Sequence, residues 1–289
     1  MLVQGARPKQ WLKNLLVFAA PAAAGVLGEW HTTLRVIAAF LIFCVVASGT
    51  YLVNDVVDAE SDRSHPVKQL RPVASGALRP GIALGVGSAL IATALGLAIL
   101  VGPWGFAVVV AAYAGLSIAY SLRLKREPVI ELAVVASCFV LRAVAGGVVA
   151  RVPLTNWFLV FTSFAALFIV TGKRYAEHSR LGSERGVHRV VLDQYTDSFL
   201  KSTLTIAATV TLASYCLWAF ERTGFIAHAG NKTVWIELTV VPVVLSVLHI
   251  LRLLDDGHGG EPEQLALHDH MLQGYGVVWL ILMSIGLYA

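Results

Sequence analysis

The stretch LRVIAAFLIFCVVASGTYLV at residues 34–53 contains 20 residues and a single charged side chain, Arg35. About 17–25 apolar residues in an α-helix cross the roughly 30 Å hydrocarbon core of a membrane. The next ten residues, NDVVDAESDR at 54–63, carry five charged side chains. The sequence therefore predicts a membrane-spanning helix that reaches the membrane surface near Asn54 and continues into a polar segment.

Composition supports lipid as the solvent for most of the chain. The 289 residues are 57% hydrophobic and 14% charged, with a mean hydropathy of +0.71, whereas a soluble domain carries about 25% charged residues. No polar linker divides the apolar blocks, so we expect a single domain over 1–289. The net charge of +4 is too small to suggest nucleic acid as a partner. The three cysteines lie in apolar blocks and are expected to be small buried hydrophobes.

Comparable apolar stretches recur along the chain. Barrel strands would alternate polar and apolar residues at every second position, and these blocks do not. The expected fold class is therefore all-α, a polytopic membrane protein with nine transmembrane helices. The first stretch also resembles a secretory signal peptide, but Trp11, Asn14 and Pro21 disfavour cleavage. The nine spans are expected at about 12–28, 34–53, 81–101, 104–121, 129–150, 154–172, 202–220, 233–251 and 271–288.

The distribution of lysine and arginine predicts the orientation. Segments on the side of the N-terminus hold 17 of these residues, and the opposite side holds four. The excess of positive charge marks the cytoplasmic side. We therefore expect the N-terminus in the cytoplasm and, with nine spans, the C-terminus outside the plasma membrane. The two long loops at about 54–80 and 173–201 would then form a cytoplasmic cap over an active site.

The polar segment after the second span contains the strongest functional signal. Asn54, Asp58 and Asp62 are spaced i, i+4 and i+8, and Asp55 lies one residue from the first of them. At about 100° per residue these four side chains, the carboxylate cluster, share one face of a helix. Like charges on one face need a cation, and oxygen ligands of this kind suit Mg²⁺. The alternative is an acidic helix end in solvent, although acids at a C-terminal end oppose the helix dipole.

Basic residues on the same predicted face provide candidate phosphate ligands, although the cytoplasmic excess of positive charge would also explain them. Asp193 and Asp197, again four residues apart, are either a second metal pair or the acidic first turn of a helix. Arg142 lies within an apolar span at a cost of about 2.5–3.5 kcal/mol, so we expect it to face a polar cavity or to bridge helices. The basic candidates and their neighbours are Arg63, Lys68, Arg71, Tyr120, Lys125, Arg126, Lys173, Arg174 and Glu177.

The pattern Asn54-Asp55-x-x-Asp58-x-x-x-Asp62 resembles the first signature of the UbiA superfamily of intramembrane transferases. The stretches RPKQWLKN at 7–14, GKRYAE at 172–177 and WAFER at 218–222 resemble its branch of decaprenyl-phosphate phosphoribosyltransferases. The resemblance runs nearly end to end and implies nine helices and a magnesium–diphosphate site. It adds Lys9, Lys13 and Tyr175 to the substrate-binding candidates.

The branch implies phosphoribosyl pyrophosphate as the donor and a polyprenyl (decaprenyl) phosphate as the acceptor, in arabinan cell-wall precursor synthesis. Aromatic prenyltransferases of the superfamily carry a second aspartate-rich motif shortly after span six, where this chain has the more basic Lys173-Arg174-Tyr175-Ala176-Glu177. A basic motif suits a donor with an additional phosphate. The expected partners are these two substrates and the membrane, and a homo-oligomer is left open.

Two other functions stay open at this point. The first is transfer of a prenyl group from its diphosphate to an aromatic acceptor, for which the metal chemistry would be the same. The second is transport, which Arg142 inside a span would suit. No internal repeat is visible, however, and the densest charges lie at the membrane boundary, whereas transporters often place their charged site at the midplane.

Overall fold

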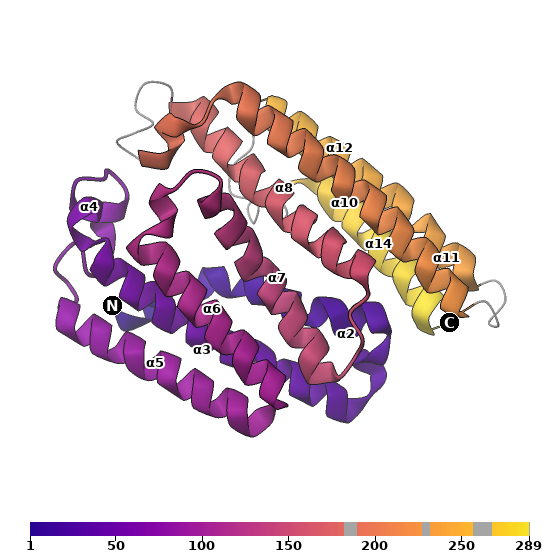
Figure 1. Ribbon diagram of the computed structural model, residues 1–289, viewed down its shortest axis with the longest axis horizontal. Helices are drawn as coiled ribbons and strands as arrows, with labels where there is room; N and C mark the ends of the chain where they lie inside the picture. The colour runs from indigo at the N-terminus through magenta and orange to yellow at the C-terminus, as the bar shows by residue number, and fades with distance from the viewer. Residues whose placement is uncertain (182–189, 227–231, 257–267, 289) are drawn as a thin grey trace. The chain divides into compact units, whose positions relative to one another are not determined.

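The computed structural model describes residues 1–181, 190–226, 232–256 and 268–288. Within these ranges the secondary structure is helical and contains no strand (Figure 1). The chain divides into two compact units, Met1–Leu154 and Thr155–Ala289. The predicted all-α fold is confirmed.

Four long helices form the body of the first unit (Figure 1). α3 packs along α5, and their backbones approach closely because Gly49 and Gly87 face each other. A Cβ atom built on Gly49 would lie 2.7 Å from the carbonyl oxygen of Gly87. Small residues allow such close helix contacts within membranes. The four helices are α3 (Trp30–Val57), α5 (Pro80–Val101), α6 (Trp104–Leu122) and α7 (Ile130–Ala150).

The first predicted span, 12–28, is not one continuous helix. After α1 (Leu2–Gly5), the chain forms the 3₁₀ helix η1 (Pro8–Phe18), the short helix α2 (Ala19–Ala24) and the turn η2 (Val26–Gly28). Gly25 has φ 74° and ends α2 in the left-handed conformation. The count of nine helices is therefore approximate, because this segment does not form one continuous helix.

The polar connection from α3 to α5 is held to the first unit by its own apolar residues. It contains α4 (Ala59–Arg63) and the short η3 (Lys68–Leu70). Val73 and Leu78 are buried at 1% and 6% exposure, in one cluster with Leu52 of α3. The burial of these side chains holds the connection expected at 54–80 against α3.

The second unit is a bundle of long helices in which α10 runs along α8 (Figure 1). The eighth predicted span, 233–251, is broken into α11 and α12 at Thr239. Pro242 explains the break, because its ring clashes with the carbonyl of Leu238 four residues earlier and proline has no N–H to donate to that carbonyl. The helices are α8 (Asn156–Leu181), η6 (Val190–Gln194), α10 (Asp197–Ile226), α11 (Lys232–Leu238), α12 (Val240–Asp255) and α14 (His270–Tyr288).

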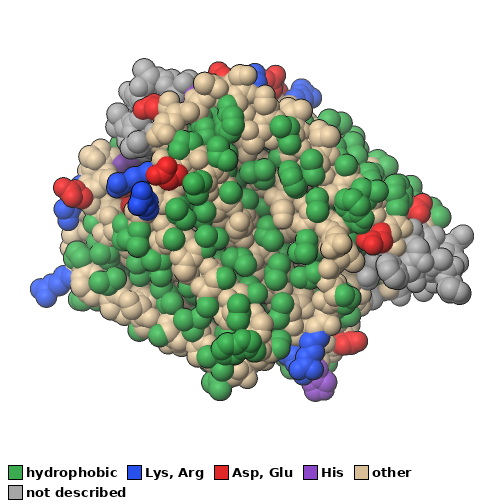
Figure 2. All heavy atoms as spheres, viewed as in Figure 1, with side chains coloured by type: hydrophobic (Ala, Val, Ile, Leu, Met, Phe, Trp, Pro, Cys, Tyr) green, Lys and Arg blue, Asp and Glu red, His purple; other side chains and the backbone are tan. Residues whose placement is uncertain are grey.

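Eight segments of the described chain are helices long and apolar enough to span a membrane. They coincide with the second to ninth predicted spans, so the multi-pass membrane architecture is confirmed. Large apolar side chains face outward on these helices, for example Leu100 at 82% and Leu41 at 55% exposure. Figure 2 shows hydrophobic side chains spread over the helices, with the charged side chains near the edges of the view.

The loop expected at 173–201 begins later than predicted. α8 continues to Leu181, so Lys173, Arg174, Tyr175 and Glu177 lie on its last turns instead of in a loop. The helix can continue because no proline or glycine interrupts 173–181, and straight-chain lysine, arginine and glutamate are good helix formers. Residues 182–189 of the expected loop lie outside the described residues.

Candidate active site

The C-terminal end of α3 continues as a helical path through the carboxylate cluster. The backbone N–H of Asp58 donates to the carbonyl of Asn54 at 2.9 Å, and that of Asp62 donates to Asp58 at 2.8 Å. The backbone therefore keeps the helical repeat from Asn54 to Asp62 on which the predicted face depends. Asp55 and Asp62 are buried at 2% and 3% exposure, while the intervening Glu60 is exposed.

Each buried carboxylate of the cluster is paired with a basic side chain. Asp55 forms ion pairs with Arg7 and, at 3.6 Å, with Arg71. Arg71 also donates to Asp62 at 2.6 Å, so Asp55 and Asp62 share one guanidinium. Lys125 also contacts the cluster, through Asp58.

Asp58 lies at the rim of the cluster and is less buried than its neighbours. Its carboxylate pairs with Lys125 of η4 (Leu124–Arg126) and accepts a hydrogen bond of 3.2 Å from the side-chain amide of Asn54. The side chain of Asp58 is 19% exposed, whereas that of Asp55 is 1% exposed. Asn54 and Asp58 are therefore the members of the cluster most open to a ligand.

The donor set fits a divalent cation of the magnesium type. Mg²⁺ is usually bound through one or two carboxylates together with water and substrate phosphates, and three carboxylates plus the amide oxygen of Asn54 supply that chemistry. Within the described residues, no group of three or more His, Cys, Asp or Glu side chains is placed so that it could hold a metal ion. Water and substrate phosphates would have to complete the coordination of Mg²⁺ at this site.

Arg7 is a site residue that the sequence analysis missed. It lies in the left-handed conformation with φ 50°, just before Pro8, and its guanidinium stacks 5.1 Å from the ring centroid of Tyr51. Tyr51 precedes Asp55 by one helical turn on α3, so Arg7 and Tyr51 belong to the same site. The sequence feature that could have pointed to Arg7 was its position among the basic residues of the predicted cytoplasmic face.

The other basic candidates of the first unit occupy different places. Arg63 donates to the backbone carbonyl of Ala74 at 3.3 Å and so fastens the loop after α4. Lys9 and Arg126 are exposed, and Lys13 lies 6.0 Å from the ring centroid of Phe139. The structure thus brings Arg71 and Lys125 to the carboxylate cluster. Roles for Lys9, Lys13, Arg63, Lys68, Tyr120 and Arg126 in binding substrate stay predictions.

Arg142 is 3% exposed and bridges three segments through neutral acceptors. It donates to the Asn14 side chain at 2.8 Å, to the Tyr113 hydroxyl at 2.9 Å and to the Cys138 carbonyl at 2.6 Å. Its guanidinium also lies 4.7 Å from the Tyr113 ring centroid. These contacts match the expectation of an arginine that links helices, and its role in substrate binding stays a prediction.

In the second unit, the end of α8 carries its own set of ion pairs. Arg174 is 4% exposed and donates to Glu177 at 3.0 Å. The ring of the buried Tyr175 lies 5.6 Å from the ammonium of Lys201, which also pairs with Asp255 at 3.7 Å. Contact between Lys173 or Arg174 and the carboxylate cluster stays a prediction.

Of the predicted second metal pair, Asp193 and Asp197, Asp197 lies beside a histidine, and a metal role for the pair stays a prediction. Asp197 begins α10 and lies 2.8 Å from Nδ1 of the buried His178, whose Nε2 is 3.0 Å from the carbonyl of Tyr195. Asp193 is exposed in η6. The position of Asp197 matches the alternative of an acidic first helical turn. His178 was missed, because a single histidine on a helix gives no signal in the sequence.

Comparison with known proteins assigns the family. Residues 15–272 match the UbiA prenyltransferase family. The chain is 41% identical to the decaprenyl-phosphate phosphoribosyltransferase of Corynebacterium glutamicum over 99% of this chain and 86% of that protein. It is 39% identical to the protein of the same name from Mycobacterium tuberculosis, over 96% and 91% of the two chains.

A solved structure shares the fold. The UbiA homologue from Archaeoglobus fulgidus, bound to GPP and Mg²⁺, superposes with a TM-score of 0.74 at 16% identity, over 99% of this chain and 97% of that one. The resemblance stated from the aspartate motif is therefore confirmed. This chain belongs to the UbiA prenyltransferase family, and its full-length relatives include decaprenyl-phosphate phosphoribosyltransferases.

Proposed function

We propose that the chain transfers 5-phosphoribose from phosphoribosyl pyrophosphate to a polyprenyl phosphate, releasing pyrophosphate, in the synthesis of arabinan cell-wall precursors. The observation that carries this proposal is the near-complete alignment, at about 40% identity, with proteins named for that activity. The paired carboxylates and cations at the end of α3 supply the chemistry that a diphosphate donor requires.

The carboxylate cluster is the proposed metal site. Asn54, Asp58 and Asp62, with Asp55 as a ligand or as a support for one, would hold Mg²⁺. A bound Mg²⁺ supplies charge neutralisation on the pyrophosphate that leaves. Arg7, Arg71 and Lys125 would hold the outer diphosphate oxygens, because guanidinium and ammonium groups pair strongly with phosphate.

The reaction breaks the bond between C1 of the ribose and the pyrophosphate oxygen and forms a bond from C1 to a phosphate oxygen of the acceptor. Positive charge that develops on the sugar ring would be stabilised by the carboxylates of the cluster. The acceptor phosphate is already anionic and attacks without a general base. This chemistry therefore requires no nucleophilic serine or histidine.

The basic residues at the end of α8 complete the proposal. Lys173 and Arg174 would bind the 5-phosphate of the donor or the head of the acceptor, together with Lys125 and Arg126. The polyprenyl chain would extend sideways into lipid between helices, whose outward side chains are apolar. With the positive side inward, this site would face the cytoplasm at the plasma membrane.

The test is pyrophosphate release by the purified full chain with phosphoribosyl pyrophosphate, with and without polyprenyl phosphate. We expect release only with both substrates, loss of release on chelation of divalent cations, and recovery with added Mg²⁺. No release under these conditions would contradict the proposed donor.

The rival activity is prenyl transfer, and a UbiA homologue bound to GPP and Mg²⁺ shares the fold of this chain. A likeness at 16% identity concerns the fold alone. Geranyl diphosphate with an aromatic acceptor serves as the comparison in the same assay, and faster release from this pair would favour the rival. Substrate uptake into vesicles without pyrophosphate release would favour a transporter.

A further inference from the structure

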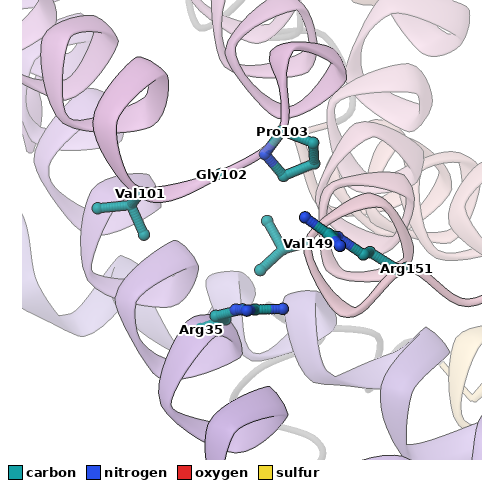
Figure 3. A pocket seen from close by; sticks show the side chains of 6 residues that line it. All are labelled: Arg35, Val101, Gly102, Pro103, Val149 and Arg151. Atoms are coloured by element: carbon teal, nitrogen blue, oxygen red, sulfur yellow. The ribbon is translucent and has the colours of Figure 1, made fainter.

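A second polar feature of the first unit lies at the end opposite to the carboxylate cluster. A pocket of about 140 Å³ is formed where the turn between α5 and α6 meets the start of α3 and the end of α7 (Figure 3). Its lining residues are Arg35, Val101, Gly102, Pro103, Val149 and Arg151.

The pocket carries two positive charges and no negative one. The side chains of Arg35 and Arg151 extend toward the same hollow from α3 and from the end of α7 (Figure 3). Among the described residues, no carboxylate forms an ion pair with either guanidinium. Two like charges that share a small space repel each other unless an anion joins them. The acid nearest in sequence, Glu29, instead accepts a hydrogen bond from Thr32 at 3.0 Å.

Three helix ends border the pocket. Pro103 is the N-cap of the 19-residue helix α6, whose first amide groups have no carbonyl partner within the helix. The positive end of the α6 dipole therefore lies at the pocket, whereas α5 and α7 end there with their negative ends. The positive charge of the pocket comes from the guanidinium groups of Arg35 and Arg151. Arg151 has φ 55° and follows α7 in the left-handed conformation, which is fixed by the hydrogen bond of 3.0 Å from Val152 N–H to the Gly147 carbonyl.

The position along α3 locates the pocket relative to the membrane. Arg35 and Asp55 are 20 residues apart on one helix, a distance of about 30 Å at 1.5 Å per residue. This length equals the usual thickness of the hydrocarbon core. Trp30 and Trp104, at 69% and 74% exposure, lie at the same end as the pocket. Exposed tryptophan is typical of the membrane interface.

We propose that this pocket binds the phosphate of an anionic lipid headgroup in the leaflet opposite to the carboxylate cluster. Two guanidinium groups suit phosphate oxygens, because each presents a planar fork of N–H donors. The small volume accommodates the phosphate, while the acyl chains remain along the exposed apolar surface of α5, which includes Leu97 and Leu100. The site is separate from the diphosphate chemistry and does not depend on the proposed function.

The test compares lipid binding by the full chain and by Arg35→Gln, Arg151→Gln and the double variant. The protein is reconstituted in nanodiscs that contain phosphatidylglycerol and phosphatidylcholine, and retained lipid is measured by native mass spectrometry after detergent release. We expect selective retention of phosphatidylglycerol, about tenfold weaker for each single variant and lost in the double variant. Arg79→Gln is the matched control, since Arg79 is an exposed arginine before α5, and it should bind as the unaltered chain does.

Thermal unfolding in neutral detergent separates loss of the site from loss of the fold. The double variant should unfold at the same temperature as the unaltered chain without lipid, and phosphatidylglycerol should raise that temperature only in the unaltered chain. Equal retention of phosphatidylglycerol by all variants would overturn the proposal. Stabilisation by inorganic phosphate without any by phosphatidylglycerol would also overturn it, because the occupant would then be a free anion.

Discussion

At the scale of single residues, the candidate site is a balanced set of charges. The carboxylates of Asp55, Asp58 and Asp62 meet Arg7, Arg71 and Lys125, so a buried acidic cluster persists without an unpaired negative charge. Burial of an uncompensated ion would be far more costly than burial of a hydrogen-bonded pair. The same arrangement allows anionic phosphates to replace carboxylates as partners of the cations.

Asp58 is the carboxylate whose replacement should affect turnover most directly. Asp58→Asn keeps the size of the side chain and removes its charge, so we expect pyrophosphate release to fall by about 100-fold or more. The measurement is the rate with phosphoribosyl pyrophosphate and polyprenyl phosphate at saturating Mg²⁺. Glu60→Gln is the control, because Glu60 is exposed two residues away. A variant at Asp58 that retained most of the activity would remove this residue from the mechanism.

Asp269 should make the stability of the folded protein depend on pH in the acidic range. Its carboxylate accepts the Leu272 N–H at 2.9 Å and lies 3.1 Å from His249 Nε2, and these hydrogen bonds, the backbone one first, lower its pKa. Because the pKa is lowered, the charged form of Asp269 stabilises the folded state at pH values above the ordinary pKa of 3.8. This stabilisation is lost as the pH falls from 3.8 through the lowered pKa of the folded state.

Asp269→Asn keeps an acceptor oxygen at the start of α14 and removes the charge. We expect a lower Tm than for the unaltered chain at pH 7 and a smaller difference in Tm below pH 3.8. The check is a series of thermal unfolding curves in detergent at several pH values. A difference that stayed constant across this range would contradict the assigned role of the charge.

At the scale of elements, close backbone packing positions the N-terminal segment. A Cβ atom on Gly146 of α7 would lie 1.8 Å from the carbonyl oxygen of Val17 in η1. η1 also carries Asn14, which is fully buried and accepts the hydrogen bond from Arg142. The broken first segment is therefore held against α7 by backbone contact and by one polar bridge.

Gly146→Ala should destabilise the protein, since the added methyl group must displace backbone. We expect a loss of about 1–3 kcal/mol, typical of overpacking, seen as a lower Tm in detergent. Gly115→Ala in α6 is the matched control, because a Cβ there meets nothing within 4 Å. Alanine in a helix is favoured over glycine by about 0.5–1 kcal/mol, so the control should be neutral or stabilising. Equal effects at both positions would contradict the packing argument.

At the scale of the whole molecule, charge asymmetry predicts the orientation in the membrane. The 17 lysines and arginines on the side of the N-terminus include the cations of the candidate site, whereas Arg35 and Arg151 belong to the four on the other side. The proposed diphosphate site and the proposed lipid-phosphate site would thus serve opposite leaflets.

Cysteine labelling tests this orientation. In a background with Cys44, Cys138 and Cys216 replaced by alanine, His31→Cys should react with a membrane-impermeant maleimide in intact cells. Glu60→Cys should react only after the cells are permeabilised. Both native side chains are exposed, at opposite ends of the α3–α4 segment. The reverse pattern of labelling would show that the active site faces outward.

The local sequence predicts the all-α membrane fold, eight of the spans and the helical repeat that continues from α3 through Asp58 to Asp62. These features depend on local hydrophobicity and on the helical repeat, which neighbouring residues specify. It did not predict the break in the first segment, where Gly25 adopts a positive φ between short helices.

The pairing of cations with carboxylates could be seen only in the folded chain. Arg7 and Asp55 are 48 residues apart, and Lys125 and Asp58 are 67 residues apart. By the sequence alone, many other basic residues of the same predicted face could equally have paired with these carboxylates. The pairing follows from the packing of η1, α3 and η4, and such long-range contacts leave no periodic signal in the chain. The two-arginine pocket arises for the same physical reason, since three separate segments supply its lining.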